Sequence, residues 1–301
     1  MEMLRKYAPA GYQVVYQYDH TSWAYKQPGC SIRMSRADFM AFVQGSTPME
    51  MAVGLPTAVH ETCHSYSSKM AWYYKEKRNL GCGHFMAYPM DLDEVAVVRV
   101  TPTFPAVETV ARIPAAARTH RCETYISRAS RDQTTQKFGI YGLVDEFNAY
   151  SQGTRTAVDL GAFYEREAPR DPRACLQYFQ AVNGISSARL EFKIFILAYL
   201  AEAKARNPTM YRAFVANREL MRAFFRVDAL FAATMQRYHR NQGAIVARLR
   251  SSGITVSEND RFLTIGDRGV GTNTLSERSL DAVLAQPAFR SLEQELRSTV
   301  R

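Results

Sequence analysis

The pattern of hydrophobic positions is clearest between residues 54 and 80. Five apolar or aromatic residues recur there three or four positions apart, which is the spacing of one face of an α-helix. A proline at position 56 suits the first turn of a helix, and glycines at positions 81 and 83 suit its end. We therefore expect a helix over 57–80, with a buried stripe that consists of Val59, Cys63, Tyr66, Met70 and Tyr73.

The same periodicity predicts further helices, most of them in the second half of the chain. A long one is expected from residue 136 to about residue 167, because prolines follow at positions 169 and 172. The remaining expected helices cover 35–44, 104–113, 173–181, 187–206, 208–225, 227–251 and 276–297, the last with a break at Pro287.

Strands are expected only as short pieces. Aromatic and β-branched residues predict one over 12–18, and a turn-rich loop is expected to lead into another by residue 33. Strands over 84–88 and 94–100 and a small hairpin starting at 261–265 complete the set. The sequence therefore predicts a predominantly helical α+β fold, with a lobe of helices and a small sheet over 1–170 and an all-helical lobe over 171–301.

The composition is that of a globular protein, with 47% hydrophobic and 22% charged residues among 301. No apolar run has the length of a membrane span, so a transmembrane segment is not expected. Residues 1–17 show no apolar core of a signal peptide, although a chain from which a signal had been removed would look the same. The compartment stays open, with export slightly favoured over the cytoplasm.

The charge bears on whether the protein binds nucleic acid, and the cysteines bear on disulfide formation. The net charge is +9, but the basic residues are scattered and no zinc-finger or RNA-binding pattern occurs, so nucleic acid is not an expected partner. Cys63 lies on the helical stripe and is expected to pack as a small hydrophobe. The other four form two disulfides in an exported protein or remain thiols in a cytoplasm: Cys30, Cys82, Cys122 and Cys175.

The expected helix over 57–80 carries the strongest chemical signal of the chain. His60 and His64 are four positions apart, so both imidazoles lie on one helical face and reach one point. Glu61 follows the first histidine and is placed to take a proton from a metal-bound water. This HExxH spacing is typical of a zinc hydrolase, which needs two nitrogen ligands, an open coordination position and a carboxylate base.

A catalytic zinc takes a third protein ligand, and the sequence favours Glu146 for it. A histidine six positions after the motif is excluded, because Met70 stands there. On the expected helix over 136–167, small residues share the face of Glu146 and would let another helix approach closely. Asp145 is the nearest competitor but faces about 100° away. The small residues on this face are Gly139, Gly142, Ala149 and Gly153.

The HExxH motif, followed some eighty residues later by a helix with Asp145, Glu146 and Phe147, resembles the gluzincin zinc metallopeptidases, the broad group of thermolysin and the membrane alanyl aminopeptidases. The resemblance implies a zincin-like catalytic lobe, a helical lobe on the other side of the cleft, and hydrolysis of a peptide or protein substrate. It also implies Zn²⁺ bound by His60, His64 and Glu146, with Glu61 as general base and then proton donor.

Two departures from the family bear on the mechanism. Tyr150 stands where thermolysin-like members carry an acid that orients a histidine. We take Tyr150 as the first candidate, either as a donor to the oxyanion or as a partner of a zinc-binding histidine. Tyr141, Arg155, Tyr125 and His120 are weaker candidates. The segment with which the aminopeptidases bind a substrate amine is absent before the motif, so an endopeptidase is favoured.

Two other interpretations stay open. One is a zinc hydrolase that acts on peptidoglycan peptides or as a secreted effector, which the basic charge fits weakly. The other is a non-catalytic helical binding protein with a vestigial metal site, since the C-terminal half carries no recognisable chemistry. The oligomeric state is not indicated by the sequence.

Overall fold

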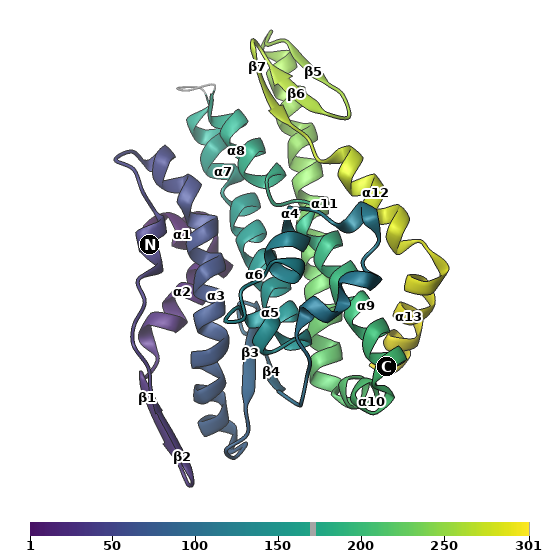
Figure 1. Cartoon of the computed structure of the whole chain (residues 1–301). Coiled ribbons are helices and arrows are strands. Elements are labelled where there is room, and N and C mark those ends of the chain that lie inside the picture. Colours follow the sequence, from purple (N-terminus) through teal and green to yellow (C-terminus); the bar gives the residue numbers. More distant parts are fainter. Residues whose placement is uncertain (169–172, 301) are drawn as a thin grey trace.

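Helices dominate the computed structural model, which describes residues 1–168 and 173–300 and in which the strands form three small antiparallel sheets (Figure 1). The predicted class, α+β and predominantly helical, is confirmed. The predicted lobe boundary at residues 170 and 171 and the prolines at 169 and 172 lie outside the described residues. No helix in the described part of the chain is long and apolar enough to cross a membrane.

The N-terminal region begins with helices where a strand was predicted. Val14, Val15 and Tyr18 are buried on one side of α2, so burial of this face outweighs the strand propensity of β-branched and aromatic residues. Proline at the first position fixes the start of that helix. The elements here are α1 (Glu2–Tyr7), α2 (Pro9–His20), β1 (Ala24–Gln27), β2 (Cys30–Arg33) and the 3₁₀ turn η1 (Phe39–Phe42).

The helix predicted over 35–44 is wrong. Only the 3₁₀ turn η1 forms there, and the Asp38 side chain accepts a hydrogen bond from the backbone nitrogen of Met40 at 3.0 Å. A side chain that bonds its own backbone in this way stabilises a turn in competition with a helix.

Helix α3 (Pro48–Arg78) carries the HExxH motif and starts nine residues before the predicted helix. Thr47 and Glu50 form a capping box, so the true start lies at Pro48, and Pro56 lies inside the helix. The end is also earlier than predicted, because Asn79 adopts a left-handed conformation with φ of 50°. The predicted stripe is confirmed as buried for all its members except the half-buried Tyr73.

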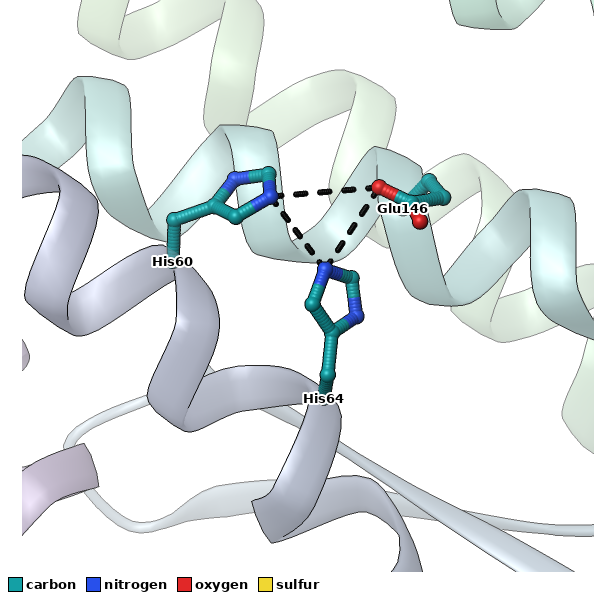
Figure 2. A group of neighbouring side chains, drawn as sticks. All are labelled: His60, His64 and Glu146. Atoms are coloured by element: carbon teal, nitrogen blue, oxygen red, sulfur yellow. Dashed lines mark hydrogen bonds and ion pairs between the residues drawn. The ribbon is translucent and has the colours of Figure 1, made fainter. Parts of the chain in front are cut away.

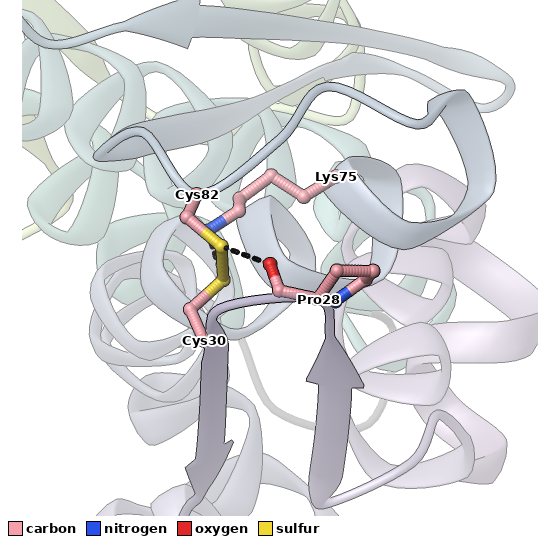
Figure 3. Close-up of a disulfide and its surroundings, with 4 residues drawn as sticks. All are labelled: Pro28, Cys30, Lys75 and Cys82. Carbon is pink, nitrogen blue, oxygen red and sulfur yellow. Dashed lines mark hydrogen bonds between the residues drawn. A yellow bond between two sulfur atoms is a disulfide. The ribbon is translucent and has the colours of Figure 1, made fainter.

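A disulfide joins Cys30 in β2 to Cys82, just beyond the end of α3 (Figure 3). It holds the β1–β2 hairpin against the C-terminal end of that helix, beside which the hairpin lies in Figure 1. Neither predicted alternative, two disulfides or four thiols, is therefore right: one bond is present, whereas Cys122 and Cys175 are free and buried. Cys63 is also free and buried, as expected for a small hydrophobe.

Strands β3 (Phe85–Asp91) and β4 (Glu94–Arg99) confirm the predicted pair and form a two-stranded sheet, with Phe85 opposite Arg99. β3 packs against α3 and α6, whereas β4 packs against α11. Short helical turns then connect the sheet to α6: η2 (Ala106–Arg112), η3 (Ala115–Ala117), α4 (His120–Cys122), the π-helical turn η4 (Glu123–Ser127) and α5 (Thr134–Lys137).

The long helix predicted over 136–167 is broken into three: α5, α6 (Ile140–Asp159) and α7 (Gly161–Glu167). The first break is at Gly139, whose φ of 50° favours glycine. Most residues of α6 are buried on all sides of the helix, which is typical of a central helix. It packs against α3 on one side and against α9 and α11 on another.

The C-terminal part is not all-helical as predicted, because one small three-stranded sheet projects at the end of α11 (Figure 1). A break between two helices was predicted near residue 226, which is wrong. The break lies at Asn217, whose side chain caps the 34-residue α11. The predicted break at Pro287 and the hairpin are confirmed, the latter with a third strand. The elements are α8 (Arg173–Asn183), α9 (Ala188–Arg206), α10 (Pro208–Ala216), α11 (Arg218–Ser251), β5 (Val256–Glu258), β6 (Phe262–Ile265), β7 (Arg268–Gly271), α12 (Thr274–Leu284) and α13 (Pro287–Ser298).

Candidate metal centre

The two histidines of α3 and the glutamate of α6 meet at one point, as predicted (Figure 2). Nε2 of His60 lies 3.2 Å from Nε2 of His64. Oε2 of Glu146 lies 3.9 Å from the first of these nitrogens and 3.5 Å from the second. The three atoms are therefore close enough to bind a single cation, and each comes from a side chain held by a regular helix.

Close contact between α3 and α6 brings Glu146 within reach of the histidines. A Cβ on Gly153 would lie 3.0 Å from the Pro56 carbonyl oxygen and 3.4 Å from Cβ of His60, so the glycine permits this approach. The prediction that Gly139 and Gly142 also permit this helix contact is wrong. Gly142 faces the backbone of Thr134, and Gly139 faces the 103–104 segment.

Asp145 orients His64, a role that the sequence reasoning missed. Oδ2 of Asp145 accepts a hydrogen bond from Nδ1 of His64 at 2.7 Å, while its other carboxylate oxygen accepts one from the Ser67 hydroxyl. Asp145 is fully buried. Asp145 is turned away from Glu146 on α6, and this offset places the two carboxylates at different nitrogens of the His64 ring. Asp145 lies at Nδ1, whereas Glu146 lies near Nε2. A carboxylate in this position fixes the tautomer and orientation of a ligating histidine.

Burial and charge set the protonation of the three candidate ligands. Burial lowers the pKa of His60 to about 3, assisted by the neighbouring His64 and by Arg121, so the ring is neutral as a ligand must be. Burial also raises the pKa of Glu146, whereas for His64 the carboxylates of Glu146 and Asp145 outweigh burial and raise the pKa of the ring.

A cavity of about 190 Å³ lies beside His60 and Glu61. Tyr125 and Tyr150 line it, and their hydroxyl oxygens are 3.1 Å apart. The Tyr150 ring meets the His60 ring edge to face, with centroids 4.6 Å apart. Glu61 is half-buried at the same cavity, and its carboxylate has no ion-pair or hydrogen-bond partner among residues 1–168 and 173–300. The candidate base and the candidate oxyanion donor therefore face one space.

A half-buried cation lies behind Tyr150, and no sequence pattern indicates it. The Arg121 guanidinium is 5.0 Å from the centre of the Tyr150 ring, and its Nη1 is 2.7 Å from Oε2 of Glu191 on α9. Its other contacts are hydrogen bonds to Ser187 and to the Gly184 carbonyl. Arg121 therefore links the aromatic wall of the cavity to the C-terminal helices.

Of the weaker sequence candidates, only Tyr125 lines the cavity. Tyr141 is bonded to Thr101, and Arg155 forms an ion pair with Asp91 at 2.8 Å. His120 contacts the Thr124 side chain at the protein surface.

Comparison with family models, curated proteins and solved structures found no match to this chain.

Proposed function

We propose that this protein is a zinc-dependent hydrolase of peptide bonds of the gluzincin type, with an endopeptidase activity favoured over an aminopeptidase activity. The observation that carries the proposal is the convergence of two imidazole nitrogens and one carboxylate oxygen from two packed helices, with a second carboxylate on the outer nitrogen of His64. A catalytic zinc site of this donor set leaves a coordination position open for water.

The residues fit a divalent cation on two counts. Oε2 of Glu146 is buried and has no hydrogen-bond partner among the described residues, although a buried carboxylate oxygen without one is costly. The donors are nitrogen and oxygen atoms, which suit zinc. Zn²⁺ is therefore the proposed cofactor, with His60, His64 and Glu146 as its protein ligands.

A bound zinc supplies Lewis acidity, which lowers the pKa of water to about 7 and polarises a carbonyl group. The Glu61 carboxylate then accepts the proton of the attacking water and passes it to the leaving amine. Tyr150 remains our candidate donor to the developing oxyanion, and its hydroxyl is held by Tyr125. Asp145 holds the His64 ring in one orientation throughout.

The proposal extends to the architecture and the compartment. In the zincin-like interpretation, α3, α6 and the β3–β4 sheet form the catalytic lobe, and the helices after residue 171 supply the other side of the cleft.

The Cys30–Cys82 disulfide supports an exported protein, because such bonds persist in oxidising compartments.

Three measurements test the proposal. Purified protein should contain about one zinc per chain, and a mixed peptide library should be cleaved at internal bonds. Glu61→Gln should keep the zinc and the fold while losing hydrolysis by about 10²-fold or more. Glu146→Ala should lose the zinc. Full activity of Glu61→Gln would exclude the proposed base, and unchanged zinc affinity of Glu146→Ala would place the third ligand elsewhere.

A further inference from the structure

A second cavity, of about 550 Å³, lies at the C-terminal end of α3 beneath the disulfide. Its floor is α3, its first wall is the tip of the β1–β2 hairpin, and its second wall is the segment that leads into β3. The charged and polar side chains that line it are those of Ser31, Ser68, Lys75 and His84, together with the ring of Trp72. No carboxylate of the described residues lines it.

Lys75 is the unusual member of this lining. Its side chain is only 3% exposed, and Nζ lies 3.7 Å from the centre of the Trp72 ring. Nζ also reaches to 3.9 Å from Sγ of Cys30, and Figure 3 shows the amine directed at the disulfide. Within residues 1–168 and 173–300 it has no carboxylate partner.

A buried ammonium group without a counter-ion is destabilising, because burial removes its hydration and neither an aromatic ring nor a sulfur atom replaces a carboxylate. Burial accordingly lowers the pKa of Lys75. An anion that entered the cavity would supply the missing charge. The other lining groups suit a carboxylate, since hydroxyl groups donate hydrogen bonds to its oxygens and an indole ring covers its alkyl stem.

The cavity lies on the same face of α3 as the candidate metal centre. Lys75 follows His64 by 11 residues (75 − 64), which is about three helical turns and returns to within about 20° of the same direction. Ser68, between them on this face, is exposed. The separation along the helix axis is about 16 Å. An extended peptide covers this distance in about five residues, at roughly 3.3 Å per residue.

We propose that this cavity is a second binding site for the peptide substrate, in which Lys75 pairs with a carboxylate located about five residues from the cleaved bond. The role as a substrate site rests on the proposed function, whereas the binding of a carboxylate does not. The carboxylate comes from an acidic side chain or from the C-terminus of the peptide, since both present the same group.

Binding to metal-free protein tests the site without reference to hydrolysis. The probes are three acetylated peptides of four alanines followed by Glu-amide, by Gln-amide or by Gln with a free carboxyl terminus. Their affinities are measured by calorimetry and by tryptophan fluorescence, which Trp72 reports. We expect wild-type protein to bind at least one of the two acidic peptides at least tenfold more tightly than the neutral Gln-amide peptide. The acidic peptide that is preferred identifies the source of the carboxylate.

Lys75→Met should abolish this preference, and Lys75→Arg should restore most of it. Lys77→Met is the matched control, because Lys77 is exposed on the same helical turn, and it should leave the preference unchanged. Equal affinity of wild-type protein for all three peptides would overturn the proposal, as would a preference that survives in Lys75→Met. The wild-type comparison decides even if Lys75→Met does not fold.

Cleavage kinetics then test the link to the metal centre. In a set of blocked peptides with one glutamate moved along the chain, kcat/KM should be greatest when it lies about five residues from the cleaved bond. Lys75→Met should remove this maximum mainly by raising KM. If no peptide is cleaved but the binding preference is found, the proposed hydrolase is wrong and the carboxylate site stands. Cleavage without dependence on the glutamate position would refute the link between the two.

Discussion

Asp145 and His64 are joined by a 2.7 Å hydrogen bond between helices α6 and α3, from Nδ1 of the ring to Oδ2 of the carboxylate. Because this bond fixes the ring, we expect Asp145→Asn to weaken zinc binding by about 10- to 100-fold without loss of the fold. Competition with a chelator of known affinity measures the effect. Asp91→Asn is the control, since Asp91 pairs with Arg155 instead of a histidine. An affinity equal to that of the wild type would show that Asp145 does not orient the ligand.

Metal removal should destabilise the folded protein. A ligand that binds only the native state stabilises it by about 4 kcal/mol when its concentration is a thousandfold above Kd. Addition of a chelator should therefore lower the melting temperature of zinc-loaded protein by several degrees. Calorimetry with and without chelator checks this. Glu146→Ala should already melt at the lower temperature and show no further response. A chelator effect of the same size in both proteins would point to a different metal site.

The disulfide should make a large contribution to stability. It spans a sequence separation of 52 residues, and a bond that closes a loop of this size stabilises by about 4 kcal/mol. The double variant Cys30→Ser with Cys82→Ser should therefore unfold at a lower urea concentration. Reduction of wild-type protein should produce the same shift, and the double variant should not respond to the reductant. A wild-type transition that reductant leaves unmoved would contradict the prediction.

Lys69 should give the stability a distinctive dependence on pH. The amine donates a hydrogen bond to the Tyr18 carbonyl and lies over the Trp23 ring, and burial lowers its pKa to about 8. Below pH 8 the amine is charged in both the folded and unfolded states, so burial of the charge disfavours folding. Between pH 8 and the unfolded pKa of 10.5 only the unfolded state keeps the proton, so stability rises with pH.

Urea unfolding of wild-type protein and Lys69→Met at pH 7 and pH 9.5 isolates this contribution, because the other titrating groups cancel in the difference. Relative to the variant, wild-type protein should gain about 1 kcal/mol over this range, after allowance for partial hydration of the amine. A difference that stays constant with pH would mean that the folded state does not depress the pKa of Lys69.

The sequence predicted the three candidate ligands because each depends on local helical geometry. His60 and His64 share a face by their spacing alone, and Gly153 signals a close helix contact on the Glu146 side. Asp145 was missed because its role depends on how far α6 is turned relative to α3, which no local pattern contains. The pairing of Cys30 with Cys82 and the position of Arg121 behind Tyr150 likewise depend on segments that are distant in sequence.

The errors in secondary structure have a similar cause. The 12–18 segment has the residues of a strand, but its apolar side chains are buried as one face of α2 against the rest of the protein. Helix α3 was predicted to start at residue 57, directly after Pro56, whereas the capping box of Thr47 and Glu50 starts it at Pro48. In both places a tertiary contact or a cap outweighed the preference of the single residue.

The proposed third ligand and the residue that orients the second ligand are consecutive in the chain, at Glu146 and Asp145. A single-residue insertion in α6 ahead of them would turn both by about 100° and move both by about 1.5 Å. Neither could then reach its present partner. Insertions and deletions ahead of these residues in α6 should therefore remove the contacts of both Glu146 and Asp145 in one step. A variant that keeps one of the two contacts and loses the other should arise by substitution.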